Sequence, residues 1–231
     1  MKKIAVFVEG QTEQIFITKL IKEFFDEKKL KIISHDMRKL YHNIRIDTFT
    51  TDTIKEYYFV IYDCGGDEKV KTDIIDNFPK LQKLNFSFII GICDLFNPQR
   101  KRIIDEEKYK KGINLGLPKT IPAKIILAVK ETEAWFIAEE KHYPAISQNL
   151  TLSIVNSMVG FDVQKESTEQ IPHPMVMLDK IYQAGNTKYS KNKYVVERTV
   201  EALDYDNLYL QVRTRNNSLN ELFTCLDGLI P

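Results

Sequence analysis

The chain has 231 residues, of which 43% are hydrophobic, so it can bury a substantial core in one large domain or in one domain with an appendage. Its 33 basic and 32 acidic residues give a net charge of +1, which excludes recruitment of nucleic acid by a global positive field. The three cysteines show no C-x-x-C spacing, and the five apolar residues after Lys3 are too few for a signal peptide. With no run of membrane-spanning length, we expect a soluble cytoplasmic protein with reduced thiols.

The first predicted elements are a strand over Ile4–Val8 and a helix that begins near Thr12. The apolar run is continuous, which is typical of a strand covered on both faces, and Gly10 then allows a tight turn. Glu13 lies in the first turn of the predicted helix, where the helix dipole favours negative charge. Glu9 and Glu13 therefore either lie together at one acidic site, or have separate roles. In the second case Glu9 is a solvated residue at the strand end, and Glu13 only complements the helix dipole.

Strand-like and helix-like segments alternate through roughly the first 140 residues. Strands are predicted over Tyr57–Tyr62, Phe86–Cys93 and Lys124–Val129, with a further edge strand over Ile44–Thr50, and helices over Asp67–Phe78 and Glu131–Glu140. This alternation predicts an α/β fold with a mainly parallel sheet flanked by helices.

From about Leu150 the pattern becomes helical. Helices are predicted from Pro174 through Tyr182, over Val195–Leu203 and over Ser218–Leu226. We therefore expect an α/β domain over residues 1–140 and a helical C-terminal extension over residues 150–231 that packs on it.

Three carboxylates follow apolar strands: Glu9, Asp94 and Glu133. Because the carboxyl ends of parallel strands share one edge of a sheet, where open α/β folds bind ligands, we expect an acidic site there. Mg²⁺ prefers oxygen ligands and is usually held by one or two carboxylates, so Glu9, Glu13 and Asp94 are the predicted metal ligands. Glu133 is either a further ligand or a partner of Asp94, or, with Glu131, an acid that complements a helix dipole.

Basic residues for substrate binding occur in two places. Arg100 follows the strand that ends at Asp94, and Lys191 lies in a basic C-terminal stretch beside Tyr189, which could stack on a base. The alternative is a solvated surface of mixed charge, since three acids over residues 105–107 balance the group around Arg100.

Two segments carry a resemblance to a known family. The run Val8-Glu9-Gly10-Gln11-Thr12-Glu13 before an amphipathic helix, and the apolar strand that ends in Asp94, resemble the metal-binding signature of Toprim domains, particularly the E-G-x-[ST]-[DE] form of OLD-type nucleases. The segment Lys130–Ala138, together with His173-Pro174 and Tyr189-Ser190-Lys191, is similar to small Toprim-like proteins found beside AAA-type ATPases in bacterial defence loci. The resemblance spans nearly the whole chain.

The resemblance implies a nuclease that uses Mg²⁺ or Mn²⁺ to cleave phosphodiester bonds in RNA or DNA. It assigns Glu9 as metal ligand or general acid/base, Asp94 as the first Asp of the usual D-x-D, and Glu13 as the second metal-holding acid. The chain departs from the pattern at Phe96, which stands where the second Asp is expected and cannot bind a cation. Either Asn97 or Glu133 compensates, with Glu133 then a catalytic residue beside Glu9 and Asp94, or one metal site is lost.

Other catalytic classes lack their signatures. The sequence has no H-E-x-x-H, G-x-S-x-G, G-x-G-x-x-G or G-x-x-x-x-G-K-[ST] motif, so any ATPase activity must come from a partner. We therefore expect the effector nuclease of an ATPase-associated anti-phage system; the alternative is a catalytically degenerate partner or regulatory subunit that binds an ATPase. Priming is remote, because the accessory regions of primases are missing. The sequence does not distinguish RNA from DNA, or a monomer from a homo-oligomer.

Overall fold

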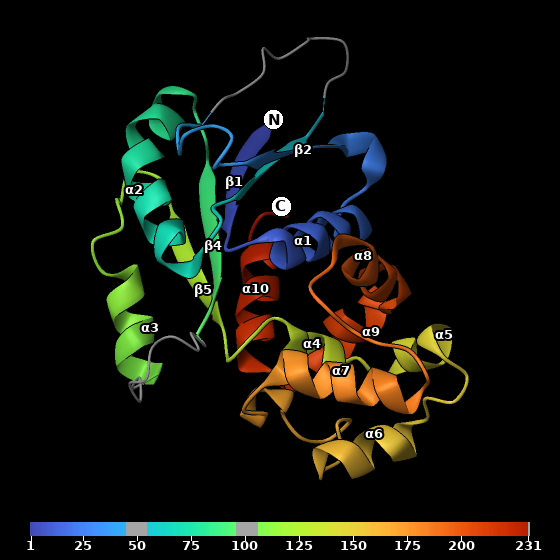
Figure 1. Ribbon diagram of the computed structural model, residues 1–231. Coiled ribbons are helices and arrows are strands. Elements are labelled where there is room, and N and C mark those ends of the chain that lie inside the picture. Colours follow the sequence, from blue (N-terminus) through green and yellow to red (C-terminus); the bar gives the residue numbers. More distant parts are fainter. Residues whose placement is uncertain (45–54, 96–105, 231) are drawn as a thin grey trace. The chain divides into compact units, whose positions relative to one another are not determined.

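The computed structural model describes residues 1–44, 55–95 and 106–230. The chain divides into two compact units, which are Met1–Cys93 with Gln99–Leu127, and Asp94–Pro98 with Ala128–Pro231. The first unit carries a parallel sheet with helices and the second is helical (Figure 1), so the predicted α/β fold with a helical C-terminal region is confirmed. Across the described ranges, every helix is too short or too polar to cross a bilayer.

A five-stranded parallel sheet forms the core of the first unit, in the order β2-β3-β1-β4-β5. The strands are β1 (Lys2–Val8), β2 (Leu30–Asp36), β3 (Tyr57–Asp63), β4 (Phe88–Asp94) and β5 (Ala123–Ala128). At the carboxyl end of the sheet, Val8 of β1 lies opposite Asp63 of β3 and opposite Ile92 of β4. All of β3 and residues 4–8 of β1 are buried, which explains their continuous apolar sequences.

The helices of the first unit are α1 (Gln11–Phe24), α2 (Asp67–Lys83) and α3 (Glu106–Asn114). The α1 helix leads from β1 toward the β2 edge of the sheet, whereas α2 and α3 lead toward the β5 edge. Because such crossovers are right-handed, α1 covers one face and the other two helices cover the opposite face, as Figure 1 shows. The carboxyl end of β1 is therefore a topological switch point, where open α/β sheets bind ligands.

The structure adds one strand that the sequence pattern did not predict, the edge strand β2. Only Leu30 of β2 is fully buried, and the following residues show no clean alternation of apolar and polar side chains. The edge strand predicted over Ile44–Thr50 falls outside the described residues except for Ile44, which is buried and belongs to no strand.

The second unit contains α4 (Glu133–Ala138), α5 (Tyr143–Ile146), α6 (Leu152–Val159), α7 (Pro174–Ala184), α8 (Lys193–Ala202), α9 (Tyr205–Leu210) and α10 (Asn217–Asp227). Every residue of α4 is buried, and this helix packs against α7. Trp135 is a core residue, and its Nε1 donates to Ser218 Oγ at 2.9 Å at the start of α10. The short apolar α4 is thus the central element of this unit, and both of its ends carry carboxylates.

Candidate active site

Glu9 and Glu13 lie beyond the carboxyl end of β1, in the first unit. The Glu9 N–H donates to the Ile92 carbonyl at 3.1 Å, and the Glu9 carbonyl accepts from Gly66 N–H at 2.8 Å, so the backbone at this position is fixed to β4 and to the turn between β3 and α2. Gly10 follows in an extended conformation and α1 begins at the next residue without a side-chain cap. This places Glu13 in the first turn of α1.

The Glu13 carboxylate is an unusual group, because it is only 3% exposed. Within the described part of the chain, its Oε1 atom has no hydrogen-bond partner. Buried polar atoms normally have one, since losing water without a replacement costs free energy. An acidic oxygen in this state at a switch point fits a cation ligand.

Asp63 ends the neighbouring strand β3, but its carboxylate is already engaged. Burial raises the pKa of Asp63, while Gly65 N–H at 2.9 Å and the Arg38 guanidinium at 3.4 Å oppose that rise. Arg38 is itself held by Asp36 at 2.9 and 3.1 Å. Asp63 thus closes a turn, whereas Glu13, with its buried Oε1, fits a ligand site in the described part of the first unit.

In the second unit, Asp94 and Glu133 are brought together by Lys191. The Lys191 ammonium lies 3.8 Å from Asp94 Oδ2 and 3.7 Å from Glu133 Oε1. The two acidic side chains are 4% and 0% exposed, whereas the lysine side chain is 44% exposed. We call these residues the lysine-bridged acid pair; its acids are buried and its ammonium is accessible to water.

Two neighbours fix the orientation of these carboxylates. The N–H and hydroxyl of Thr132 both donate to Asp94 Oδ1, at 3.0 and 3.2 Å. The Tyr189 hydroxyl donates to Glu133 Oε1 at 2.9 Å. Each acid therefore has one oxygen held by a neutral donor, which pre-organises it for binding a charged group.

The backbone around Thr132 explains how the acids reach this position. Lys130 adopts the left-handed conformation with φ 67°, which turns the chain out of β5 before α4 begins. Glu131 then accepts from Met175 N–H at 2.8 Å, and so joins this turn to the start of α7. Non-glycine residues with positive φ are uncommon and concentrate at functional sites.

With both carboxylates ionised and the lysine protonated, the lysine-bridged acid pair carries a net negative charge. Two ionised carboxylates that are largely shielded from water repel each other, and a bound cation reduces that repulsion. In the described ranges no group of three or more His, Cys, Asp or Glu side chains is arranged to hold a metal. Two carboxylates remain compatible with Mg²⁺, which keeps several waters and is commonly completed by substrate phosphate.

The other residues singled out in the sequence either lie outside the described ranges or have a different role from the one expected. Arg100, Phe96 and Asn97 lie outside the described residues. Tyr189 is only 3% exposed and bonds Glu133, so it positions an acid and cannot stack on a base as the sequence suggested. Thr132 was not predicted as a site residue. A threonine before a helix is common, and no sequence pattern indicates that it donates to Asp94, which lies 38 residues earlier in the chain.

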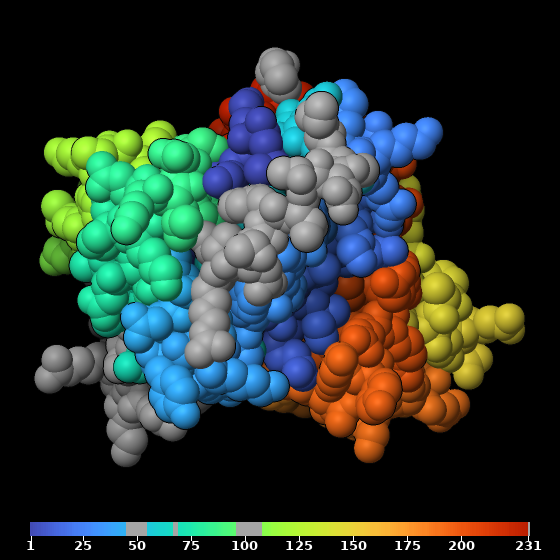
Figure 2. Space-filling view, turned by 90° about the horizontal axis from the view of Figure 1, so that it is seen from above, coloured from blue at the N-terminus to red at the C-terminus, as the bar shows by residue number. Residues whose placement is uncertain are grey.

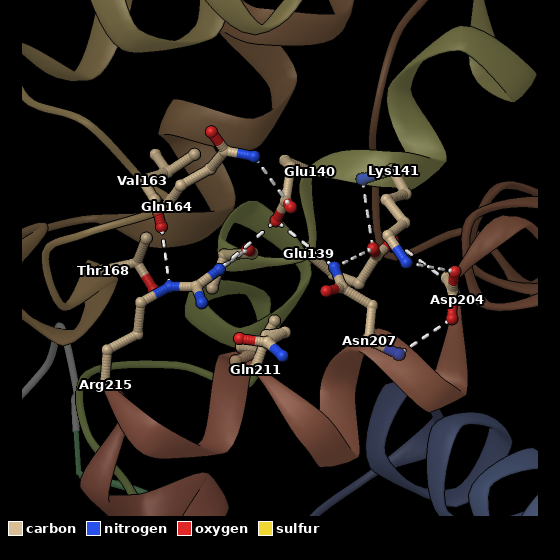
Figure 3. A network of polar contacts seen from close by, with 12 residues as sticks. Glu139, Glu140, Lys141, Val163, Gln164, Thr168, Asp204, Asn207, Gln211 and Arg215 are labelled. Carbon is tan, nitrogen blue, oxygen red and sulfur yellow. Dashed lines mark hydrogen bonds and ion pairs between the residues drawn. The ribbon is translucent and has the colours of Figure 1, made fainter.

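The other end of α4 carries a different carboxylate, Glu139, shown in Figure 3. Its oxygens accept from Lys141 N–H at 3.0 Å, His142 N–H at 3.0 Å, Asn207 Nδ2 at 2.7 Å and Asp204 N–H at 3.2 Å. Burial alone would raise the pKa of Glu139, but hydrogen bonds from His142 and Asn207 outweigh it and lower the pKa. We call this group the Glu139 network.

Comparison of the chain with models of protein families, with curated proteins and with solved structures found no match. The assignment of function therefore depends on the chemistry of the two acidic sites described above.

Proposed function

We propose that this chain is a divalent-metal-dependent nuclease that hydrolyses phosphodiester bonds in RNA or DNA. The observation that carries the proposal is the placement of Lys191 between the buried carboxylates of Asp94 and Glu133. Paired acids with an accessible ammonium can bind a cation and a phosphate side by side, which phosphodiester hydrolysis requires.

Each residue of the lysine-bridged acid pair then has a role. Lys191 binds a non-bridging oxygen of the scissile phosphate, for which its 44% exposed side chain is suited, since the ammonium lies 3.8 Å from Asp94 Oδ2 and 3.7 Å from Glu133 Oε1. Asp94 and Glu133 hold Mg²⁺ or Mn²⁺, oriented by Thr132 and Tyr189. When bound, such an ion supplies a polarised phosphoryl oxygen and an activated water.

Glu9 and Glu13 are acids of the first unit, and we propose their roles from that unit alone. The buried Oε1 of Glu13 is suited to bind a cation, and Glu9, which is less buried, is suited to act as a general base. In the overall reaction, water adds to phosphorus, one P–O bond breaks, and the proton taken from water passes to the leaving oxygen. The Toprim resemblance supports the same assignment.

A separate ATPase is the proposed partner. The sequence contains no phosphate-binding loop of the G-x-x-x-x-G-K-[ST] type, so nucleotide-driven control must come from another chain. The resemblance to proteins encoded beside AAA-type ATPases supports an anti-phage effector controlled in this way. Phe96 in place of the second Asp supports a second candidate, a non-catalytic subunit that binds the ATPase.

Cleavage of labelled single-stranded and duplex DNA and RNA with Mg²⁺ or Mn²⁺ tests the proposal, with and without the partner ATPase. We expect wild type to cleave at least one substrate, and Asp94→Asn and Glu133→Gln each to reduce the cleavage rate by about 10³-fold. Glu166→Gln, an exposed acid of the same unit, is the matched control and should cleave like wild type.

One outcome would contradict the assigned residues, and another would contradict nuclease activity itself. Cleavage that survives in a Glu9→Gln, Asp94→Asn double variant would come from another site or a contaminant. A wild-type chain that cleaves none of the substrates, even with the ATPase and Mn²⁺, would favour the non-catalytic subunit.

A further inference from the structure

The segment Lys188–Tyr194 contains both the acid-binding Tyr189 and Lys191. It has the sequence K-Y-S-K-N-K-Y, with three lysines, two tyrosines and no acidic residue, in a chain whose net charge is only +1. We call this segment the basic loop. Figure 2 shows the part of the chain around residues 185–200, in orange to orange-red, on the surface in view.

The basic loop is held in place by the protein. Tyr189 is buried, and its N–H donates to Asp179 at 3.0 Å. The Arg198 guanidinium donates to the Lys188 carbonyl at 2.9 Å and to Thr187 Oγ1 at 3.1 Å. Asn192 caps α8 by accepting from Tyr194 N–H at 3.1 Å. A loop fixed by so many bonds needs no ligand to become ordered, so little entropy is lost when it binds one.

The side chains that the basic loop presents to solvent are suited to nucleic acid. Lys188 is exposed, the Lys193 side chain is 60% exposed, and Tyr194 is 80% exposed. Lys193 is paired with Glu197 only at 3.7 Å across an exposed helix turn, a contact that a phosphate can replace. Ammonium groups interleaved with an exposed ring are the usual combination for contacting phosphates and stacking bases.

The short separation in sequence limits how far Lys188 and Tyr194 can lie from Lys191. Consecutive Cα atoms are about 3.8 Å apart, so the Cα atoms of Lys188 and Tyr194 each lie within about 12 Å of that of Lys191. Phosphate contacts on either side of Lys191 would therefore hold neighbouring nucleotides of a strand whose scissile phosphate lies at the lysine-bridged acid pair.

We infer that the basic loop is a binding track for single-stranded nucleic acid, in which Lys188 and Lys193 contact phosphates and Tyr194 stacks on a base. The inference deepens the proposed function and rests on it, since Lys191 belongs to both. A single strand is favoured over a duplex, because an exposed ring can stack only on a base that is not already paired and stacked.

Binding without catalysis tests this inference separately from cleavage. Fluorescence anisotropy of labelled oligothymidine and oligouridine of about 16 nucleotides, the larger site size of one binding module, is measured in EDTA with the full chain. We expect Tyr194→Ala to weaken binding roughly five- to hundred-fold and Tyr194→Phe to restore it. Lys188→Gln should reduce the slope of log affinity against log salt by about 0.7.

Matched controls are available in the same chain. Tyr41→Ala removes a ring that is 83% exposed in the first unit, and Lys165→Gln removes an exposed lysine elsewhere in the second unit; both should bind like wild type. Duplex DNA should bind more weakly and show no dependence on Tyr194. The two arms with oligothymidine and oligouridine show whether DNA or RNA is preferred.

The outcomes separate the two proposals. Wild type that fails to bind either oligonucleotide, or Tyr194→Ala that binds like wild type, overturns the track even if the chain cleaves nucleic acid. Tyr194-dependent binding by a chain that never cleaves supports the track and rejects the nuclease. Equal Tyr194 dependence on duplex DNA overturns the preference for a single strand.

Discussion

Two buried carboxylates, one at each end of α4, are held in opposite ways. Glu133 begins the helix and Glu139 follows its last residue, and both are 0% exposed. Glu139 accepts from four nitrogen donors that are all fixed by the fold. Glu133 accepts from the Tyr189 hydroxyl and faces Lys191, whose side chain is 44% exposed.

The difference separates a structural acid from one that is available for chemistry. A carboxylate saturated by rigid donors stabilises the fold, because any change leaves buried groups without partners. A carboxylate beside a partly exposed lysine at 3.7 Å can exchange that partner for a cation and a phosphate. Burial alone therefore does not identify a functional acid, whereas the exposure of its charged partner does.

The largest expected effect is on cleavage at the lysine-bridged acid pair. Glu133→Gln should reduce the cleavage rate by about 10³-fold, because the neutral amide holds a divalent cation more weakly than a carboxylate and cannot take up a proton, while Gln still accepts from Tyr189. The free energy of unfolding, measured with urea, should change by less than about 1 kcal/mol. A variant that unfolds more easily and cleaves normally would make Glu133 a structural acid like Glu139.

The next largest effect is on stability at the Glu139 network. Glu139→Gln should lower the free energy of unfolding by about 3 kcal/mol, because the amide NH₂ group faces donors that the carboxylate satisfied. Where the variant is folded, its cleavage rate should match that of wild type. Equal stability of variant and wild type in urea would show that the network adds nothing to the fold.

A smaller effect is expected at Arg215, which extends the same network. Its guanidinium donates to the Val163 carbonyl at 2.8 Å and the Ala138 carbonyl at 2.9 Å, and pairs with Glu140 at 3.2 Å (Figure 3). Arg215→Lys keeps the charge but cannot bond in these directions together, so we expect a loss of about 2 kcal/mol in the free energy of unfolding. Thermal and urea unfolding should agree on this loss, and an unchanged midpoint would reject it.

The smallest expected effect is a pH dependence of the contribution that Glu139 makes to the free energy of unfolding. The pKa of Glu139 in the folded protein is lowered from its ordinary value of 4.5, so its stabilisation is present above that pH and is lost as the pH falls through the folded pKa. The stability difference between wild type and Glu139→Gln should thus shrink below about pH 4.5, by at most about 1.4 kcal/mol per pH unit. A difference that stays constant down to acid unfolding would contradict the lowered pKa.

The sequence predicted the centre of the sheet and the edge strand β5, and missed the other edge strand, β2, for a physical reason. The central strands β1 and β3 are buried on both faces and so have continuous apolar sequences that stand out. The edge strand β2 is mostly half-exposed and reads as a charged, irregular stretch, because it forms through pairing with β3. Trp135 was predictable as core from its apolar neighbours.

The candidate site was predictable only where strand ends mark it. Asp94 and Glu133 follow apolar runs, so their place near the carboxyl ends of strands was evident. The bond between Tyr189 and Glu133 joins residues 56 apart, and no periodicity or spacing indicates it. Lys191 was singled out by the resembling segment alone, and its position between two particular acids depends on how the helices of the second unit pack.

The course of the chain between its two units limits how the protein can be dissected. Asp94 belongs to the second unit, yet it is separated from the rest of that unit by residues 99–127 of the first. A fragment that starts at Ala128 would keep Glu133, Tyr189 and Lys191 but leave Thr132 without the carboxylate that it binds. Residues 128–231 expressed alone would therefore lack one acid of the lysine-bridged acid pair. A version of the protein divided into two chains must supply the short peptide around Asp94 as part of the other chain.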